Sequence, residues 1–575
     1  MTPEVLEAKL GRRLPGGGRE TADQILDRVS TRLGEIERQH GAGDSWAPRF
    51  RALMADNKFW PSGRILNNCG ATQGQLASCF VLPVEDDFGS ILEALTLAAR
   101  CHRTGGGTGF DLSPMRERGA PISTAEAAGS SGPVSWLDLF DAETSVVMKG
   151  GKMRGANLAS LSVRHPDVLE FIDAKEVVGR LPCFNLSVSV DDRFFAELDA
   201  GADIELVSPH GGHVVGRVPA AEIWSRIADN AWRTGDPGLL FVDAINRGNV
   251  LLDHLGPIRT TNPCGEQTLY PYEASNLGSL NLSAFRSADG TGVDLAALDE
   301  ATELAVRMLD DAIDASVYPD PRITAMARAN RRIGLGVMGF ADLLVALGVP
   351  YDSEEALAVV DRVGAVIQTA GHRATRRLAA ERGPFPNWEH SSLTEPARNC
   401  AVTTIAPTGT ISMVAGCSSG IEPRFAPAWN KDVLEENGID FVDTDLVADV
   451  RAATGMTERE AVAAVSRFGA GALPDDGRRA RYRYAYDVSG LWHVRVAARW
   501  QRWTDNAVSK TVNLPRDATP EQVGEVMRAS WESGSKGVSV YRQGSREHDL
   551  LSTVQQAESN LAQSKALLAA TGGVR

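Results

Sequence analysis

The heptapeptide Thr261-Asn262-Pro263-Cys264-Gly265-Glu266-Gln267 places one thiol between an amide and a carboxylate. Side chains at alternate positions of an extended or tightly looped backbone lie on the same side. We therefore expect Asn262, Cys264 and Glu266 to reach one small substrate together, as a hydrogen-bond donor, a sulfur and a proton acceptor. Pro263 stiffens this stretch and Gly265 gives it conformational freedom. The alternative interpretation is a buried structural cysteine in a turn, and the rest of the chain must decide between the two.

The length and composition are those of a large globular enzyme. The chain has 575 residues, 43% of them hydrophobic and 23% charged, and no Ser/Gly linker or charge block divides its middle. We predict one large catalytic domain with helical additions at its ends. The most apolar run, residues 333–349, is interrupted by Asp342 and several glycines, which favours a buried strand and helix over a membrane span. The N-terminus has no apolar signal-peptide segment, so the expected location is cytoplasmic, away from membranes.

Charge and cysteine usage exclude two further classes of protein. The net charge of -15 argues against a nucleic-acid polymer as partner, because such binders present a basic face. The seven cysteines are scattered and show no Cys-x-x-Cys spacing, so they indicate neither a structural zinc site nor a disulfide framework. We expect reduced thiols and no metal held by protein ligands.

Three stretches are suited to hold a sugar or a phosphate. Residues 103–110 are extremely rich in glycine, which lets the backbone approach a ligand closely. Residues 149–157 combine glycines with three cations, although a solvated surface turn is the alternative there. The predicted strand 399–406 ends in a small, hydroxyl-rich turn at 407–413 that opens a helix, an arrangement that binds phosphate. No Gly-Lys-Ser/Thr follows, so a nucleotide is better described as substrate than as fuel.

Eight segments resemble, in order, the large catalytic subunit of ribonucleotide reductases, and most closely the adenosylcobalamin-dependent class II enzymes. They lie between about residues 60 and 545 of the sequence. The segments are Pro61–Arg64, Ser78-Cys79, Gly105–Gly109 with Ser113-Pro114, Asn262–Glu266, Asn276–Ser279, Pro407–Ser412, Ser419–Pro423 and Ser509–Pro515.

The resemblance implies a fold of the α/β class. We expect a ten-stranded α/β barrel of two five-stranded parallel half-sheets, with the catalytic Cys264 at the tip of an internal finger loop. A barrel interior would keep a sulfur radical from water. The division expected is a short helical N-terminal segment at 1–55, the barrel at 56–545, and a C-terminal tail without redox cysteines at 546–575.

The resemblance also implies the chemistry and the cofactor. A radical formed from adenosylcobalamin would take hydrogen from Cys264, and the resulting thiyl would remove the 3'-hydrogen of the ribose. Glu266 would accept the 3'-hydroxyl proton, Asn262 would hold the sugar hydroxyls, and Cys79 would protonate the departing 2'-hydroxyl. The absence of a Tyr-Tyr pair in the last third of the chain and the segment Gly534–Arg542 favour cobalamin over a metal-containing radical generator.

Substrate and effector residues are implied in the same way. The nucleoside is expected to contact Ser62, Ser78 and Gly107, and the loop residues Pro263 and Gly265 are expected to line the substrate as well. Diphosphates are the expected substrates. Nucleotide specificity effectors (dNTP or ATP) would bind at the interface of a homodimer. The phosphates would bind Pro407, Thr408, Gly409, Thr410, Ile411 and Ser412, and the effectors would bind Lys149, Lys152, Arg154, Lys175 and Arg180.

One position departs from the family pattern. Ser275 stands eleven residues after Cys264, where the family has its second redox cysteine, and the usual C-terminal cysteine pair is missing. Two thiols that become a disulfide are the ordinary source of the two electrons needed, and a serine cannot form that bond. Cys69 or Cys417 are candidates to replace the missing thiol. We expect the side chains of Ser275 and Cys79 to face each other across the substrate cleft.

This departure leaves several functions open. An engineered exchange would explain the serine. An external reductant, of the thioredoxin type or formate, would explain it as well. It is also explained by a radical enzyme that performs a non-reductive dehydration or rearrangement of a nucleotide. An inactive nucleotide-binding regulator is the remaining alternative, against which the intact trio Asn262, Cys264 and Glu266 argues.

Overall fold

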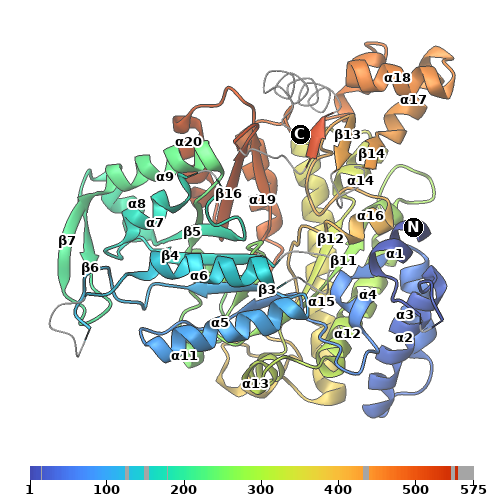
Figure 1. Cartoon of the computed structure of the whole chain (residues 1–575). Coiled ribbons are helices and arrows are strands. Elements are labelled where there is room, and N and C mark those ends of the chain that lie inside the picture. Colours follow the sequence, from blue (N-terminus) through green and yellow to red (C-terminus); the bar gives the residue numbers. More distant parts are fainter. Residues whose placement is uncertain are drawn as a thin grey trace, which may run out of the picture.

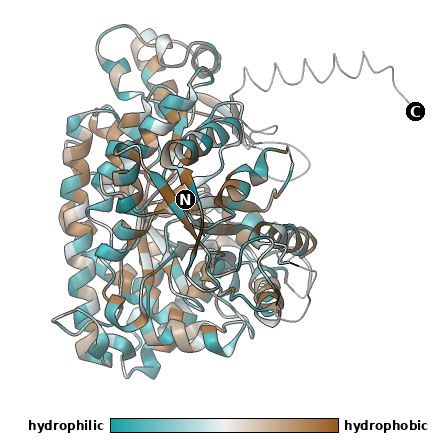
Figure 2. Ribbon diagram, turned by 90° about the vertical axis from the view of Figure 1, so that its left-hand side faces the viewer, coloured by the Kyte–Doolittle hydropathy of each residue, from teal (hydrophilic) through white to brown (hydrophobic). Residues whose placement is uncertain are grey.

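A computed structural model describes residues 1–14, 16–122, 129–147, 155–177, 179–431, 439–545 and 551–553. Its centre is a barrel of parallel strands surrounded by helices (Figure 1). Figure 2 shows hydrophilic and hydrophobic stretches alternating along the outer helices, as expected for helices that bury one face.

The first half of the barrel has five strands, each parallel to the next. Cys79 pairs with Gly107, Thr108 with Asn157, Asn157 with Phe184, and Ser187 with Gly238. Helices α5 (Phe88–Arg103) and α6 (Pro133–Val146) lie over this half-sheet (Figure 1). The strands are β2 (Cys79–Val81), β3 (Gly107–Asp111), β4 (Asn157–Ser162), β5 (Phe184–Val190) and β8 (Gly238–Phe241).

The second half is also parallel. It contains β11 (Ala274–Asn281), β12 (Ile333–Met338), residues 403–405, β15 (Thr511–Leu514) and β16 (Gly537–Arg542). Residues 403–405 join their neighbours through the parallel bridges Leu335–Thr403 and Ile405–Val508. The two halves meet antiparallel, β8 with β16 and β11 with β2, which closes the barrel. The predicted ten-stranded barrel of two parallel halves is confirmed.

Burial on both faces explains the apolar composition of β12. Every residue of β11 and of β12 is buried, because the finger loop covers one face and helices cover the other. Parallel strands that are buried on both faces form apolar runs without polar alternation, as in Ile333–Met338. Strand β1 (Phe59–Pro61) adds to β11 in the antiparallel sense outside the barrel proper.

The N-terminal helices share a core with the barrel's outer helices. Leu33 and Phe50 pack in one apolar cluster with Leu309 of α12 (Leu295–Ala315). The fully buried carboxylate of Glu37 pairs with Arg307 at 2.5 Å. Figure 1 shows these blue helices on the opposite side of the molecule from β4. The helices are α1 (Pro3–Leu10), α2 (Ala22–Gln39) and α3 (Trp46–Ala55).

The remaining helices and strands connect the barrel strands or lie around the barrel. Among the described residues, no helix is long and apolar enough to cross a membrane. The helices are α4 (Gly63–Asn68), α7 (Val168–Ile172), α8 (Asp192–Asp199), α9 (Ala220–Thr234), α10 (Val242–Arg247), α11 (Leu252–Leu255), α13 (Pro321–Asn330), α14 (Phe340–Leu347), α15 (Glu354–Arg382), α16 (Ile411–Ala415), α17 (Thr444–Thr454), α18 (Glu458–Phe468), α19 (Gly490–Gln501) and α20 (Pro520–Glu532). The strands are β6 (Asp203–Val207), β7 (Val214–Pro219), β9 (Thr260–Thr261), β10 (Thr268–Leu269), β13 (Ala428–Lys431), β14 (Ile439–Val442) and β17 (Leu551–Thr553). Short 3-10 helices occur at Asp173–Lys175, Leu282–Phe285, Pro386–His390, Gly469–Ala472 and Arg478–Arg481.

Candidate active site

The heptapeptide forms the tip of a hairpin. Its stem is the antiparallel pair β9 and β10, and Asn262 closes the turn. The side-chain oxygen of Asn262 accepts from the amide of Gln267 at 2.9 Å, and its carbonyl accepts from the amide of Gly265 at 3.0 Å. Gly265 has a φ of 82°, a left-handed conformation that glycine adopts without steric cost.

The first half-sheet holds the hairpin on one side. A Cβ on Gly107 would lie 2.8 Å from the Pro263 ring, and one on Gly109 would lie 1.8 Å from the Thr261 carbonyl oxygen. Asn185 of β5 donates its side-chain N–H to the carbonyl of Pro263 at 2.9 Å. The glycines of the stretch 103–110 therefore make room for the loop.

The second half-sheet holds the hairpin on the other side. The carbonyl of Glu266 accepts from the Thr404 hydroxyl at 2.8 Å and from the amide of Ala507 at 2.9 Å. Gly334 of β12 faces Gln267, because a Cβ added to this glycine would lie 2.5 Å from Nε2 of the Gln267 side chain. The loop thus lies between the two half-sheets, as expected for an internal finger loop.

The thiol of Cys79 meets two side chains of the loop. Asn262 donates its Nδ2 hydrogen to the Cys79 sulfur at 3.1 Å, and the sulfur lies 3.7 Å from Oε1 of Glu266. All three residues are buried. Burial, followed by the negative charges of Glu266 and Cys264, raises the pKa of Cys79 well above its usual value of 9.0. Cys79 is thus a neutral thiol that can donate a proton.

Burial likewise raises the pKa of Glu266 above its ordinary value of 4.5. Its second carboxylate oxygen, Oε2, is buried and has no hydrogen-bond partner among the described residues. A buried oxygen without a partner is costly, and a substrate hydroxyl would satisfy it. This carboxyl is therefore suited to accept a proton from a substrate.

Cys264 itself is exposed, unlike its neighbours. The expectation of a sulfur shielded from water is wrong for this structure. The stem and the flanking Asn262 and Glu266 are buried, whereas the tip projects beyond them, and a Cβ on Gly265 would meet nothing within 4 Å. Cys264 remains close enough to Cys79 to affect its pKa.

Ser275 lies directly beside Cys79. The two are paired residues of the adjacent antiparallel strands β11 and β2, and Ser275 is buried. They are therefore neighbours in one sheet, which corrects the expectation that they face each other across a cleft. Neither proposed substitute thiol joins them, because Cys69 lies in the core shared with the N-terminal helices and Cys417 lies beside Gly339.

The expected nucleoside contacts adjoin this group. The Ser78 hydroxyl donates to the Ser62 hydroxyl at 3.2 Å, and Gly107 is the strand partner of Cys79. Strands β1 and β2 both pair with β11, so the residue after β1 and the residue before β2 come together. Ser62, Ser78, Cys79 and Gly107 thus lie next to one another.

The expected phosphate turn follows residue 405 immediately. Ala406 packs in one apolar cluster with Cys79 and Leu277, which brings the turn close to the thiol. Thr408 has a φ of 54°, and its hydroxyl accepts from the amide of Gly420 at 2.8 Å. Helix α16 then begins at Ile411, and the exposed Gly409 faces outward.

Comparison with known proteins matches this arrangement to one family. Residues 77–397 and 393–541 match the family profile "Ribonucleotide reductase, barrel domain". The chain belongs to the ribonucleotide reductase family.

Two relatives and one solved structure illustrate the reductase similarity. The chain is 44% identical over 544 residues to the "Vitamin B12-dependent ribonucleoside-diphosphate reductase" of Mycobacterium tuberculosis (strain CDC 1551 / Oshkosh), covering 93% of this chain and 78% of that protein. It is 41% identical over 573 residues to the protein of the same name from Thermoplasma acidophilum, covering 98% and 73%. The alpha subunit of a class Id ribonucleotide reductase from Actinobacillus ureae has the same fold, with a TM-score of 0.76, 21% identity and coverage of 93% and 95%.

The expected effector residues of this reductase are only partly described. Lys149, Lys152 and Arg154 lie outside the described residues. Lys175 donates to the carbonyl of Phe184 at 2.7 Å and pairs with a buried aspartate, Asp236, at 2.9 Å. Arg180 pairs with Asp138 at 3.1 Å. Both cations thus have partners within the chain in this structure, and effector binding stays a prediction.

Arg64 is a reductase residue to which the sequence argument gave no role. It lies in the first turn of α4, and its guanidinium packs over Gly105, whose Cβ would come within 1.9 Å of Nη1. Burial lowers its pKa, and no carboxylate pairs with it among the described residues. An arginine two residues after Ser62, directly after Gly63, was the available signal.

Proposed function

We propose that this protein reduces ribonucleotides to 2'-deoxyribonucleotides through a thiyl radical at Cys264, with adenosylcobalamin as cofactor. The observation that carries the proposal is the contact of Cys79 with both Asn262 and Glu266 beside the fingertip thiol. These four groups provide a hydrogen-atom acceptor, a proton donor, a proton acceptor and an amide at one place. The names of the relatives at 44% and 41% identity support the cofactor and the reaction.

Each residue has a defined task in this reaction. Cys264, as a thiyl, removes the 3'-hydrogen of the ribose and later returns a hydrogen atom. Glu266 accepts the 3'-hydroxyl proton, and its raised pKa brings it closer to the working pH, which favours proton transfer. The neutral thiol of Cys79 protonates the 2'-hydroxyl, which leaves as water. Asn262 orients the sugar hydroxyls.

The fingertip fits a large cofactor. The Cys264 side chain is exposed and the Cβ direction of Gly265 is open, so a bulky group can approach the sulfur. Cys264 and Gly265 are the contacts that we expect for it. When bound, adenosylcobalamin supplies the radical chemistry that a thiol cannot start alone.

The electron source follows from Ser275. Conversion of a ribonucleotide to a deoxyribonucleotide and water consumes two electrons and two protons. Cys79 contributes one thiol, and Ser275 beside it cannot complete a disulfide. We propose that an external reductant supplies both electrons: a thioredoxin-type dithiol is oxidised to its disulfide, or formate to carbon dioxide, while Cys79 donates a proton and is protonated again. Without it, the reaction would end in elimination products, so the non-reductive reaction is the second candidate.

The ligands and assembly are part of the proposal. Ribonucleoside diphosphates are the proposed substrates, with their phosphates on the turn of Pro407–Ser412. A nucleotide effector at a homodimer interface is proposed for the loops near residues 149–157 and 175–182. Family membership supports both.

One experiment separates the alternatives. The protein is incubated with adenosylcobalamin and each ribonucleoside di- or triphosphate, with dithiothreitol, thioredoxin or formate added in turn. Deoxynucleotide supports the proposed reduction, whereas free base or an unsaturated sugar supports the non-reductive reaction. Unchanged nucleotide without cleavage of the cobalt–carbon bond would show an inactive nucleotide binder and overturn the proposal.

A further inference from the structure

A cavity of about 220 Å³ lies at the end of the barrel opposite the proposed phosphate turn. Its lining includes Cys400 to Val402, which precede the strand segment 403–405, and Asp505 and Lys536, which precede β15 and β16. The phosphate turn follows the same segment at its other end. Strands of this half-sheet are parallel, so the cavity and the turn lie at opposite ends. The cavity is therefore distinct from the active site.

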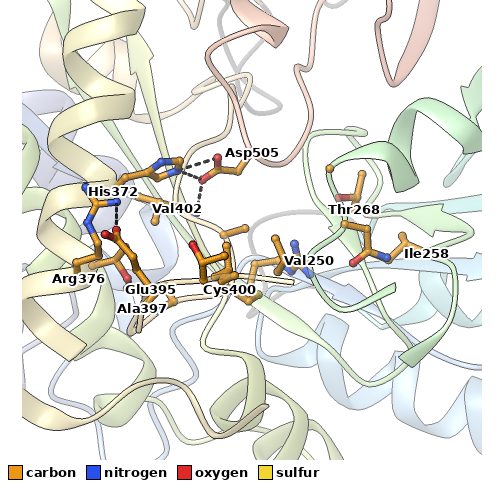
Figure 3. Close-up of a pocket in the computed structure, with 18 of the residues that line it drawn as sticks. Val250, Ile258, Thr268, His372, Arg376, Glu395, Ala397, Cys400, Val402 and Asp505 are labelled. Atoms are coloured by element: carbon orange, nitrogen blue, oxygen red, sulfur yellow. Dashed lines mark hydrogen bonds and ion pairs between the residues drawn. The ribbon is translucent and has the colours of Figure 1, made fainter. Parts of the chain in front are cut away.

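The walls of the cavity are of two kinds (Figure 3). On one side lie the charged residues His372, Arg376 and Asp505, and on the other lie Val250 and Ile258. Its volume is several times the roughly 30 Å³ that one water occupies in the liquid. There is room for a small organic molecule with a polar and an apolar end.

The ammonium of Lys536 has no carboxylate in direct contact with it among the described residues. Its ammonium donates to the carbonyl of Asp505 at 2.6 Å, and no carboxylate lies within 4.0 Å of it in the part of the chain that the structure describes. The Asp505 carboxylate is occupied by His372 at 3.0 Å and by the amide of Val402 at 2.8 Å. Burial lowers the pKa of Lys536 to about 8, and the negative charge of Asp505 only partly opposes this shift.

A second cation, Arg332, makes the electrostatic potential in the cavity more positive. Arg332 also lines it and lies close enough to Lys536 to lower its pKa. Arg332 has its own partner, Glu273, at 3.0 Å. Arg376, on the far wall, likewise has Glu395 at 3.2 Å (Figure 3). The one buried cation without a carboxylate partner on this wall is thus Lys536, among the described residues.

We propose that this cavity binds a small organic carboxylate, with its carboxylate on Lys536 and its short apolar body against Val250, Ile258 and Leu393. A buried ammonium gains most from a carboxylate that is itself removed from water. The apolar wall favours an alkyl chain over a bare inorganic ion.

The bound carboxylate would act on the finger loop. Ile258 and Thr268, which both line the cavity, lie just before and within the two-stranded stem that carries Cys264. Asp505 belongs to the segment whose Ala507 amide donates to Glu266. A ligand that fills the cavity is therefore expected to restrict the base of the loop.

The test uses the full chain without nucleotide or cofactor, at constant ionic strength. Titration calorimetry measures the binding of acetate, propionate, butyrate and inorganic phosphate. We expect the dissociation constant to fall by about fourfold per methylene, the equivalent of about 0.8 kcal/mol for each one buried. Butyrate should also slow hydrogen exchange of residues 258–270. Phosphate binding tighter than butyrate, or no carboxylate binding, would overturn the proposal.

Two variants localise the binding. Lys536→Met keeps the length of the side chain but removes the charge, and should weaken butyrate binding at least tenfold. Lys58→Met is the matched control, because that lysine is partly exposed and lies 3.8 Å from Asp56. Val250→Phe fills the cavity while it keeps Lys536, so it tests the site even where Lys536→Met fails to fold. Unchanged butyrate binding in Val250→Phe would place the anion elsewhere and refute the assignment.

Discussion

Ser275 and Cys79 show how one residue can change the redox chemistry of a site without changing its fold. They are directly paired in antiparallel strands, where Cα atoms are about 4.5–5.5 Å apart. That spacing lies within the range that a disulfide spans, about 4.4–6.8 Å. The backbone thus suits a cysteine pair, and the serine hydroxyl alone prevents it.

Ser275→Cys should therefore create a disulfide with Cys79. We expect thiol titration of the denatured protein to show two fewer thiols after oxidation than before it, and deoxynucleotide formation with dithiothreitol to increase. Ser279→Cys is the control, because Ser279 pairs with Trp60 and has no thiol opposite it. An unchanged thiol count in Ser275→Cys would contradict the pairing.

Glu266 determines the acid side of the pH profile. It accepts a proton only while ionised, so the rate falls as the pH drops through its pKa, which burial raises above 4.5. We expect this fall in rate to occur above pH 4.5 in the wild type and to be absent in Glu266→Gln. The variant should retain roughly 10⁻² to 10⁻⁴ of the activity. Circular dichroism at each pH controls for unfolding, and a wild-type rate that is flat down to pH 4.5 would argue against this role.

Arg64 is expected to contact the bound nucleotide, because its buried charge has no carboxylate partner among the described residues. In Arg64→Met the KM should rise by at least tenfold while kcat changes less, and Arg64→Lys should recover part of the loss. Comparison of ribonucleoside mono- and diphosphates shows whether the guanidinium contacts the phosphates or the nucleoside. Equal KM values in wild type and Arg64→Met would refute a binding role.

At the scale of elements, the finger loop requires glycine in the strand beside it. Residues 107 and 109 of β3 point into the barrel, where the loop backbone occupies the volume of a side chain. The hairpin is therefore positioned by the absence of side chains at Gly107 and Gly109 as well as by the hydrogen bonds of Asn185 and Thr404.

Gly109→Ala should displace the loop, because its Cβ would lie 1.8 Å from the Thr261 carbonyl oxygen. We expect at least a hundredfold loss of turnover and a decrease of about 1–3 kcal/mol in the free energy of unfolding. Gly43→Ala is the control, since its Cβ would meet nothing within 4 Å. Turnover and denaturant unfolding are measured for both. Wild-type turnover in Gly109→Ala would show that the loop does not need this close approach.

At the scale of the whole molecule, buried ion pairs join the N-terminal helices to the helices around the barrel. Glu37 of α2 contacts Arg307 of α12 and Arg382 of α15, at 2.5 and 2.6 Å. A buried pair loses most when one partner is removed and the other stays charged. Residues 1–55 and the barrel are therefore expected to unfold together.

Arg307→Met should lower the free energy of unfolding by about 3–5 kcal/mol, because Glu37 remains buried beside it with less compensation. Arg51→Met removes a partly exposed arginine that pairs with the exposed Asp23 and Asp27, and should change the stability little. Thermal and denaturant unfolding measure both. Equal stabilities of the two variants would contradict a structural role for the buried pair.

Local sequence patterns were enough to predict much of the fold and part of the site. The strand at 333–338 and the chemistry of Asn262, Cys264 and Glu266 depend on residues close in sequence. The strand predicted at 399–406 is reduced to bridges at Thr403 and Ile405, and the glycines of 103–110 make room for the finger loop, where a ligand was expected. The barrel itself came from the resemblance, because the closing contacts join residues as distant as Cys79 and Ser275 or Ile405 and Val508. No local pattern contains such pairings.

The sequence by itself determined which atoms are available for the chemistry: one fingertip thiol, one carboxylate, one amide and a serine where a second thiol is expected. Only the tertiary structure decided that Cys264 is exposed, that Ser275 adjoins Cys79 in the same sheet, and that Lys536 lines a separate cavity without a carboxylate partner among the described residues. The physical reason is that exposure and pairing depend on packing between segments hundreds of residues apart, whereas the identity of a reactive group is fixed by its side chain.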